Sequence, residues 1–207
     1  MALSIRDVQL RDLEAVLALN NAAGSTILPL DAARLRHLFE QACYFRLVEV
    51  DGQVAGFLPA LRDDADYDSP NFLWFRSRFE QFVYIDRIVL ARPWRGLGLG
   101  RVLYADVTSH AEVRVPLLAC EVFLEPRDDV SLLFHGTSGF QEVGQQVMPS
   151  NGRRVALLAK TLCSFAFVRE TYLEGPMRRL PELPWLAERA HGHLATPAAG
   201  ARAAGGA

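Results

Sequence analysis

Apolar and polar positions alternate in two neighbouring stretches of the chain, residues 44–50 and 53–58. Asp51 and Gly52 stand between them, and an Asp-Gly pair tolerates the positive φ angles of a tight hairpin turn. The pattern therefore predicts a β-hairpin. Residues 3–6 have the composition of a further strand and are expected to start the same sheet.

Two short helices are predicted between that first strand and the hairpin. Asp12 is placed as the N-cap of the first, and Gly24 lies beyond its end as a stop. Asp31 is placed as the N-cap of the second helix, whose apolar residues follow at helical spacing: Leu35, Leu38 and Phe39.

A second group of elements follows residue 82. We expect a strand over 82–90, a helix from about 98 to 112 and a buried strand over 116–124. Because one helix separates the two strands, they should run parallel with a right-handed crossover. A short helix over 131–135 and a last hairpin, 140–143 with 154–159, complete the pattern.

Residues 62–79 break the alternation and mix acidic with aromatic side chains. Acids beside aromatics suit the wall of a small-molecule site, so we interpret the segment as an ordered excursion. The alternative is that the aromatics only anchor a long loop on the core.

The chain after residue 163 has a looser pattern, yet it keeps Phe165, Phe167, Tyr172 and Trp185. These residues predict that the segment docks on the domain or on a second copy of the chain, as in a homodimer. An Ala/Gly/Pro-rich run follows and is expected to be disordered. The predicted organisation is a domain over 1–161, an extension over 162–194 and a tail over 195–207.

Composition narrows the class of protein. Of the 207 residues, 50% are hydrophobic and 22% are charged, with a formal net charge of −2. We expect a cytoplasmic globular protein, since neither a bilayer-spanning run nor a basic, apolar leader is visible. The charge balance argues against nucleic-acid and membrane partners. His191 and His193 have no nearby Cys or acidic residue, so no metal site is expected.

A glycine-rich turn joins the predicted strand 82–90 to the helix that follows. Gly96, Gly98 and Gly100 free the backbone N–H groups to close on an anion at a helix start, and Arg95 and Arg101 flank them. The turn therefore predicts a site for a pyrophosphate.

Two common phosphate ligands are excluded by residue. A dinucleotide fingerprint would need glycine at Arg101, or glycine or alanine at Leu103. A nucleoside triphosphate loop would need Gly-Lys-Ser/Thr, which is missing here. No serine stands in the context of a hydrolase nucleophile.

The turn resembles the signature of the GCN5-related N-acetyltransferase family, Arg/Gln-x-x-Gly-x-Gly/Ala, which reads here Arg95-Gly-Leu-Gly98-Leu-Gly100. A second family segment, a strand end followed by a short helix and Gly-Phe, is matched over 128–135 and by Gly139-Phe140. The resemblance covers roughly residues 3–161.

The resemblance implies an α+β, three-layer fold. Its mixed, mostly antiparallel sheet of about seven strands is flanked by helices and splays between the fourth and fifth strands. It also implies acetyl-CoA, or a close acyl-CoA, as donor. Its pyrophosphate would lie on the amides of residues 95–101 and its pantetheine along the end of the fourth strand. The implied cofactor-binding residues are Ile88, Val89, Leu90, Arg95, Gly96, Gly98, Gly100, Arg101, Asp128 and Ser131.

The implied chemistry is direct attack of an amine on the thioester, which needs a base and an acid for the thiolate. Asp86 is our first candidate base and Glu121 the second; the alternative for each is a structural carboxylate, with Arg87 as the partner of Asp86. The chain departs from the family in Asp128, where many members carry Asn, and in His135, where many carry Tyr. His135 is the candidate acid, with a packing role as its alternative.

The acceptor would be a small-molecule amine, a protein N-terminus or a lysine. The acidic, aromatic excursion suits a cationic acceptor. The candidate acceptor-binding residues are Asp64, Tyr67, Trp74 and Tyr84. Because of the two departures, a non-catalytic module that binds acyl-CoA is the alternative function.

Overall fold

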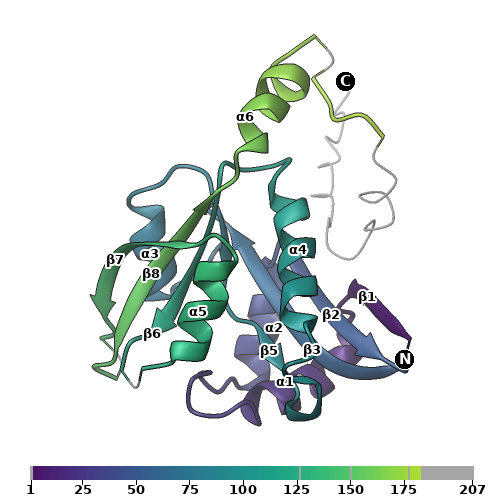
Figure 1. The fold of residues 1–207 in the computed structure, drawn as a ribbon, viewed down its shortest axis with the longest axis vertical. Coiled ribbons are helices and arrows are strands. Elements are labelled where there is room, and N and C mark those ends of the chain that lie inside the picture. Colours follow the sequence, from purple (N-terminus) through teal and green to yellow (C-terminus); the bar gives the residue numbers. More distant parts are fainter. Residues whose placement is uncertain (1, 126, 150, 177, 183–207) are drawn as a thin grey trace, which may run out of the picture.

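The computed structural model describes residues 2–125, 127–149, 151–176 and 178–182. Its centre is one sheet with the strand order β1-β2-β3-β4-β6-β8-β7, and β5 pairs with β3 beside this path (Figure 1). The strands are β1 (Leu3–Asp7), β2 (Tyr44–Val50), β3 (Gln53–Arg62), β4 (Val83–Ile85), β5 (Val89–Leu90), β6 (Leu117–Phe123), β7 (Gln141–Val147) and β8 (Arg154–Thr161). Neighbours are antiparallel except β4 and β6, which run parallel. The predicted mixed, mostly antiparallel sheet is confirmed.

Helices cover both faces of the sheet and make the fold three-layered (Figure 1). They are α1 (Leu13–Asn21), α2 (Ala32–Gln41), α3 (Pro70–Arg76), α4 (Leu99–Ala111), α5 (Asp129–Thr137) and α6 (Ser164–Val168). Alternate residues of β2 serve different layers: Tyr44 and Val48 pack with α4, whereas Phe45 and Leu47 pack with α1 and α2. The sheet is therefore apolar on both sides, which explains the long buried runs of β2 and β3.

The predicted strand 82–90 is two short strands. Asp86, Arg87 and Ile88 separate β4 from β5. β4 pairs with β3 and, through Val83 and Tyr84, with β6. Within the described residues, β5 pairs with β3 alone, so the sheet opens between β5 and β6. This is the splay that the resemblance implied.

The excursion 62–79 is more regular than predicted. β3 runs on to Arg62, and α3 forms inside the segment. Tyr67, Phe72 and Phe75 are buried. The Tyr67 ring contacts Phe72, and the rings of Phe72 and Phe75 each contact Phe82 and Tyr84. The aromatic residues of the excursion therefore form core beneath one end of the sheet.

The predicted cap at Asp12 is wrong in its contacts. Its carboxylate makes no capping bond to α1 and instead accepts from Arg6, at 2.7 and 2.9 Å, and from the Gln9 N–H at 2.7 Å. Asp31 does cap α2, accepting from the Arg34 N–H at 2.7 Å.

The chain beyond β8 forms α6 and a π-helical turn, Arg169–Leu173. Phe165 and Val168 are buried, while 63% of Phe167 is exposed. The domain boundary at 161 and the docking of the extension stay predictions. Trp185, His191, His193 and the tail 195–207 lie outside the described residues. Within the described part, no helix is both long and apolar enough to cross a bilayer.

A glycine fixes the distance between β3 and β5. A Cβ at Gly56 would lie 2.4 Å from Leu90 Cδ2 and 2.6 Å from the Val89 carbonyl oxygen. We expect Gly56→Ala to lower the free energy of unfolding by about 1–3 kcal/mol, because the backbone of β5 must move. Equilibrium unfolding in urea measures this change in the free energy of unfolding.

Gly136 in α5 is the matched control, since a Cβ there meets no atom within 4 Å. Gly136→Ala should leave stability unchanged or raise it by up to about 1 kcal/mol. Equal losses in both variants would show that the close approach at Gly56 carries no cost.

Candidate functional site

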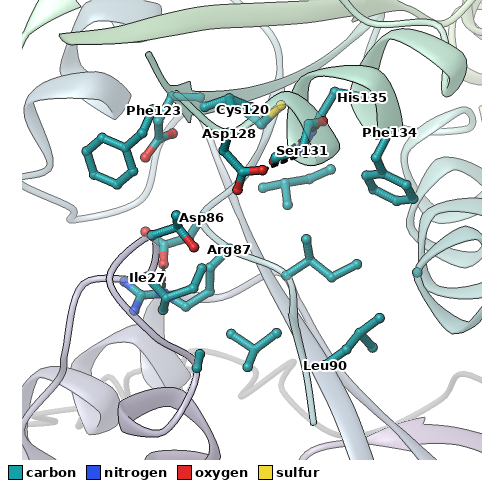
Figure 2. A pocket seen from close by; sticks show the side chains of 18 of the residues that line it. Ile27, Asp86, Arg87, Leu90, Cys120, Phe123, Asp128, Ser131, Phe134 and His135 are labelled. Carbon is teal, nitrogen blue, oxygen red and sulfur yellow. Dashed lines mark hydrogen bonds and ion pairs between the residues drawn. The ribbon is translucent and has the colours of Figure 1, made fainter. Parts of the chain in front are cut away.

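A cavity of about 810 Å³ lies where the sheet opens. The loop between α1 and α2 (residues 22–31), the excursion, β5, the glycine turn, β6 and α5 all contribute to its walls. Figure 2 shows side chains from these walls, among them Asp86 and Arg87, Asp128 and Ser131, and Phe134. The predicted site residues that line it are Tyr67, Asp86, Ile88, Val89, Leu90, Arg95, Gly96, Gly98, Gly100, Arg101, Glu121, Asp128, Ser131 and His135.

The glycine turn presents backbone to this cavity. Gly96 and Gly98 have φ angles of +79° and +84°, and a Cβ at either would meet no atom within 4 Å. Gly98 is the N-cap of α4, and no side chain caps the helix. The first N–H groups of a 13-residue helix therefore face the cavity with the positive end of its dipole. This arrangement attracts an anion.

Arg95 also has a structural role. Its Nε donates to the Leu90 carbonyl oxygen at 2.9 Å, and its Nη2 donates to the Ala23 carbonyl oxygen at 3.2 Å. The side chain thus joins the glycine turn to β5 and to the α1–α2 loop. Its charge remains beside the turn.

Two further arginines fix the α1–α2 loop. Arg87 donates to the Leu28 carbonyl oxygen and Arg153 to the Ser25 carbonyl oxygen, each at 2.9 Å. Three arginines from separate parts of the chain therefore hold three carbonyl groups of one cavity wall. These contacts could not be predicted from the sequence, because a surface loop and a distant arginine have no recognisable spacing.

Asp86 is fully engaged. Its Oδ1 accepts a hydrogen bond from the Tyr67 hydroxyl, and its Oδ2 accepts from Arg87 Nε at 2.6 Å. The side chains of Asp86 and Arg87 are only 4% and 9% exposed. The buried pair raises the pKa of Arg87, chiefly through Asp86, against the effect of desolvation. The geometry is that of the structural alternative for Asp86.

Glu121, on β6, is in a different state. Burial, together with the nearby charge of Asp86, raises the pKa of its carboxyl to about 7. The hydrogen bond from the Tyr84 hydroxyl favours the charged form and opposes that rise. A carboxyl group with a pKa near neutrality can exchange a proton at ordinary pH.

His135 is buried between α5 and α4. One ring nitrogen, Nδ1, lies 2.7 Å from the Ser131 carbonyl oxygen, which only accepts, so Nδ1 carries the hydrogen. The other, Nε2, lies 2.8 Å from the Tyr104 hydroxyl, which then donates to it. Burial lowers the pKa of His135 and favours this neutral form. The ring ties α5 to α4.

Asp128 and Ser131 interact at the start of α5. Asp128 is the N-cap, and its Oδ1 accepts from the Ser131 N–H at 2.9 Å. The asparagine position of the family is therefore occupied here by a capping carboxylate. Both residues line the cavity.

Three predicted acceptor residues do not line the cavity. Asp64 is exposed at the surface. Trp74 stacks with Phe75 and under the Arg78 guanidinium, 4.0 Å from its ring centroid, and faces Gly144 of β7. Tyr84 is fully buried and acts on the cavity only through Glu121. The physical reason is that the excursion turns its aromatic rings into the core and its acids to the solvent.

Two residues were missed by the sequence analysis. Asn71 of α3 and Tyr104 of α4 both line the cavity, and Tyr104 contacts His135. Tyr104 could have been expected from its position one helical turn after the glycine signature. Nothing in the sequence singles out Asn71.

Comparison with known proteins gives one family. The sequence model of the "Acetyltransferase (GNAT) family" matches residues 13–140. No curated protein sequence matches the chain.

Solved structures share the fold. The ribosomal-protein-S18-alanine N-acetyltransferase from Escherichia coli has a TM-score of 0.61 at 15% identity, covering 78% of this chain and 94% of that one. The ribosomal-protein-alanine N-acetyltransferase from Brucella melitensis has a TM-score of 0.60 at 24% identity, and the match covers 77% of this chain and 99% of that one. Naa50 from Arabidopsis thaliana, in complex with the bisubstrate analogue CoA-Ac-MVNAL, has a TM-score of 0.58 at 14% identity. The match covers 77% of this chain and 99% of that one. At these identities the likeness is one of fold.

The Tyr104–His135 hydrogen bond gives a test of the tie between α4 and α5. Tyr104→Phe and His135→Phe should each lower the free energy of unfolding by about 1–3 kcal/mol, because each leaves a buried polar partner unpaired. The double variant should lose less than the sum, and a double-mutant cycle in urea measures the difference.

Thr137→Ala is the control, since its exposed hydroxyl bonds only within α5. It should change stability by no more than about 0.5 kcal/mol. Additive losses from Tyr104→Phe and His135→Phe would contradict a direct tie.

Proposed function

The chain belongs to the acetyltransferase (GNAT) family, and from this premise we propose that it transfers an acetyl group from acetyl-CoA to an amine by direct attack on the thioester. One observation carries the proposal. A single cavity has an uncapped, glycine-bearing helix start in one wall and a carboxyl group with a pKa of about 7 in another.

The residues present fit acetyl-CoA. The pyrophosphate would bind the N–H groups of the glycine turn, where Gly96 and Gly98 leave space for it and Arg101 adds charge. The pantetheine would run along the backbone of Ile88, Val89 and Leu90, where β5 has no partner on its cavity side within the described chain. Asp128 and Ser131 border the same space. The Arabidopsis neighbour with its CoA analogue supports this donor.

We assign the base to Glu121 rather than Asp86, which reverses the order given by the sequence. A proton leaves the acceptor ammonium for Glu121, the nitrogen–carbon bond to the acetyl group forms, and the carbon–sulfur bond breaks to release the CoA thiolate. The second proton that the nitrogen loses as it becomes an amide passes to solvent. Asp86 is the poorer base because Tyr67 and Arg87 already occupy both of its oxygens.

His135 is given no acid role in this proposal. Its one N–H is donated to the Ser131 carbonyl oxygen, and Nε2 accepts from Tyr104. Proton donation to the thiolate would require breaking the bond to Ser131. An alkyl thiol has a pKa of about 8.5, so the thiolate is a tolerable leaving group without a side-chain acid.

The acceptor is a small-molecule amine or a protein amine. Part of the cavity lining is apolar, with Ile27, Leu28, Pro29, Phe123 and Met148. This lining favours an apolar group beside the amine and gives no support to the cationic acceptor inferred from the excursion. The homodimer and the cytoplasmic location stay predictions.

Glu121→Gln tests the base. We expect kcat to fall by about 10²–10⁴-fold while acetyl-CoA binding is kept, because the amide cannot take the proton. Release of CoA thiol, followed over a panel of amines, measures turnover. In the unmodified enzyme kcat/KM should rise with pH through a midpoint at about 7, since the base must be deprotonated.

Asp86→Asn is the comparison for this test. It should cost stability through the unpaired Arg87, and it should move the pH midpoint downward without abolishing it, because the charge of Asp86 raises the pKa of Glu121. A midpoint that disappears in Asp86→Asn and persists in Glu121→Gln would return the base to Asp86.

Gly98→Ala tests the donor site. The φ angle of +84° costs about 1–2 kcal/mol with a Cβ, and the Cβ enters the space proposed for the pyrophosphate. We expect acetyl-CoA affinity, measured by calorimetry, to fall by at least about tenfold.

Gly152→Ala is its matched control, with a φ angle of +67° in the β7–β8 hairpin turn and the same open surroundings. Gly152→Ala should lower stability about as much as Gly98→Ala does, and it should leave the affinity for acetyl-CoA unchanged. Acetyl-CoA binding without turnover on any amine would instead favour the non-catalytic module.

A further inference from the structure

One charged side chain of the cavity wall has no task in the proposed function. Within the described chain, the arginines that line the cavity are Arg34, Arg87, Arg95 and Arg101. Arg87 is paired with the buried carboxylate of Asp86, and Arg95 and Arg101 stand at the glycine turn. Arg34 of α2 is therefore the lining arginine whose charge is still to be explained.

The contacts of Arg34 place it at the rim of the cavity, apart from the proposed donor strand. Its Cζ lies 5.3 Å from the centroid of the Tyr67 ring, and the Tyr67 hydroxyl donates to Asp86. Figure 2 shows Asp86 near Ile27 and at a distance from Leu90. The Arg34 side chain is 39% exposed, so its guanidinium lies where the cavity meets the solvent.

The ion pair of Arg34 leaves its guanidinium able to bind a second anion. Its Nη2 donates to Asp68 Oδ1, and the Asp68 side chain is 76% exposed. An ion pair this open to water contributes little free energy, so another carboxylate can compete with it. A guanidinium also carries five N–H donors in one plane, of which this hydrogen bond uses one.

The acids of the excursion do not offset this charge inside the cavity. Asp63, Asp64, Asp66 and Asp68 all lie outside the lining, whereas Arg34 belongs to it. A cationic group of an acceptor would therefore meet like charge at Arg34, and an anionic group would meet the opposite charge. The charge at this rim is the reverse of the one that the excursion predicted.

We propose that Arg34 binds a carboxylate of the acceptor, which is then an amine that also carries a carboxylate and an apolar group. This assignment rests on the proposed function, in which the acceptor amine meets Glu121. The apolar group would lie against lining residues such as Ile27 and Phe123. A free apolar amino acid and a short peptide with a free C-terminus both have this chemistry, and the experiment separates them.

Arg34→Gln is the main variant. The acceptors are leucine, methionine and phenylalanine, their dipeptides with a C-terminal glycine, and the methyl ester of each compound. We expect the ratio of kcat/KM for the acid to that for its ester to fall about tenfold in Arg34→Gln, because a charge-assisted hydrogen bond is lost. Release of CoA thiol measures it. A fall confined to the dipeptides would identify a peptide as the source of the carboxylate.

Asp68→Asn has the opposite expectation. Because the competing carboxylate is removed, KM for the acids should fall about two- to threefold, while KM for the esters stays the same. If Arg34→Gln and Asp68→Asn both raised KM for acids and esters alike, the ion pair would be structural and the proposal would be overturned.

Arg36→Gln is the matched control. Arg36 lies on the same helix, pairs with Glu40 at 2.6 Å and does not line the cavity. It should leave KM for every acid and ester unchanged. A loss of acid preference in Arg36→Gln equal to that in Arg34→Gln would show a general effect of surface charge and would contradict a site at Arg34.

A binding measurement separates this proposal from the proposed function. Binding of the same compounds is followed by ligand-observed NMR with CoA present and no acetyl donor, so that no turnover is needed. Binding that is stronger for acids than for esters, and that loses this preference in Arg34→Gln, supports the carboxylate site even if no acetyl group is transferred. Acid-to-ester ratios that are the same in Arg34→Gln and the unmodified enzyme refute the site while the acetyltransferase activity stands. Absence of carboxylate-dependent binding across the whole panel refutes it as well.

Discussion

The site depends on the place where one strand stops pairing with its neighbour. After β4 the chain leaves the ladder with β6 and β5 does not rejoin it. Asp86 and Arg87, which lie between β4 and β5, pair with each other in a largely buried position. A buried charge without a partner costs several kcal/mol, so the pair makes the break tolerable. Because β5 continues along β3 only, a cavity opens between β5 and β6.

The same ion pair connects the cavity walls. Arg87 also donates to Asn20 at 2.9 Å and to the Leu28 carbonyl oxygen, and Asp86 accepts from Tyr67 of the excursion. The contacts of Asp86 are therefore those of a structural residue. Glu121 forms no salt bridge within the described part of the chain. Its pKa of about 7 allows it to take up a proton, as a base must. Two carboxylates close together thus have separate tasks because their partners differ.

Much of the fold could be predicted from local patterns. The hairpin at Asp51-Gly52, the α4 start after Gly98 and the parallel β4–β6 pair depend on short-range rules, and the structure has all three. The break inside 82–90 was missed, because the apolar residues on both sides of Asp86 and Arg87 are of types common in strands. Side-chain direction was harder still. Trp74 and Asp64 were expected at the site, yet neither lines the cavity, whereas Asn71 of the same excursion does. Asp128 and His135 were recognised by position, but their roles follow from the hydrogen bonds at the start and inner face of α5.

Gly56 shows that the residues shaping a binding surface need not belong to it. It lies on β3 and does not line the cavity, yet any side chain at this position would push against Leu90 and the Val89 carbonyl group, which do. β5 is held there by only two residue pairs. A mutational survey restricted to the residues that line the cavity would therefore miss Gly56, where a single added methyl group would displace β5. Redesign of the cavity should therefore include the residues of β3 that pack against β5.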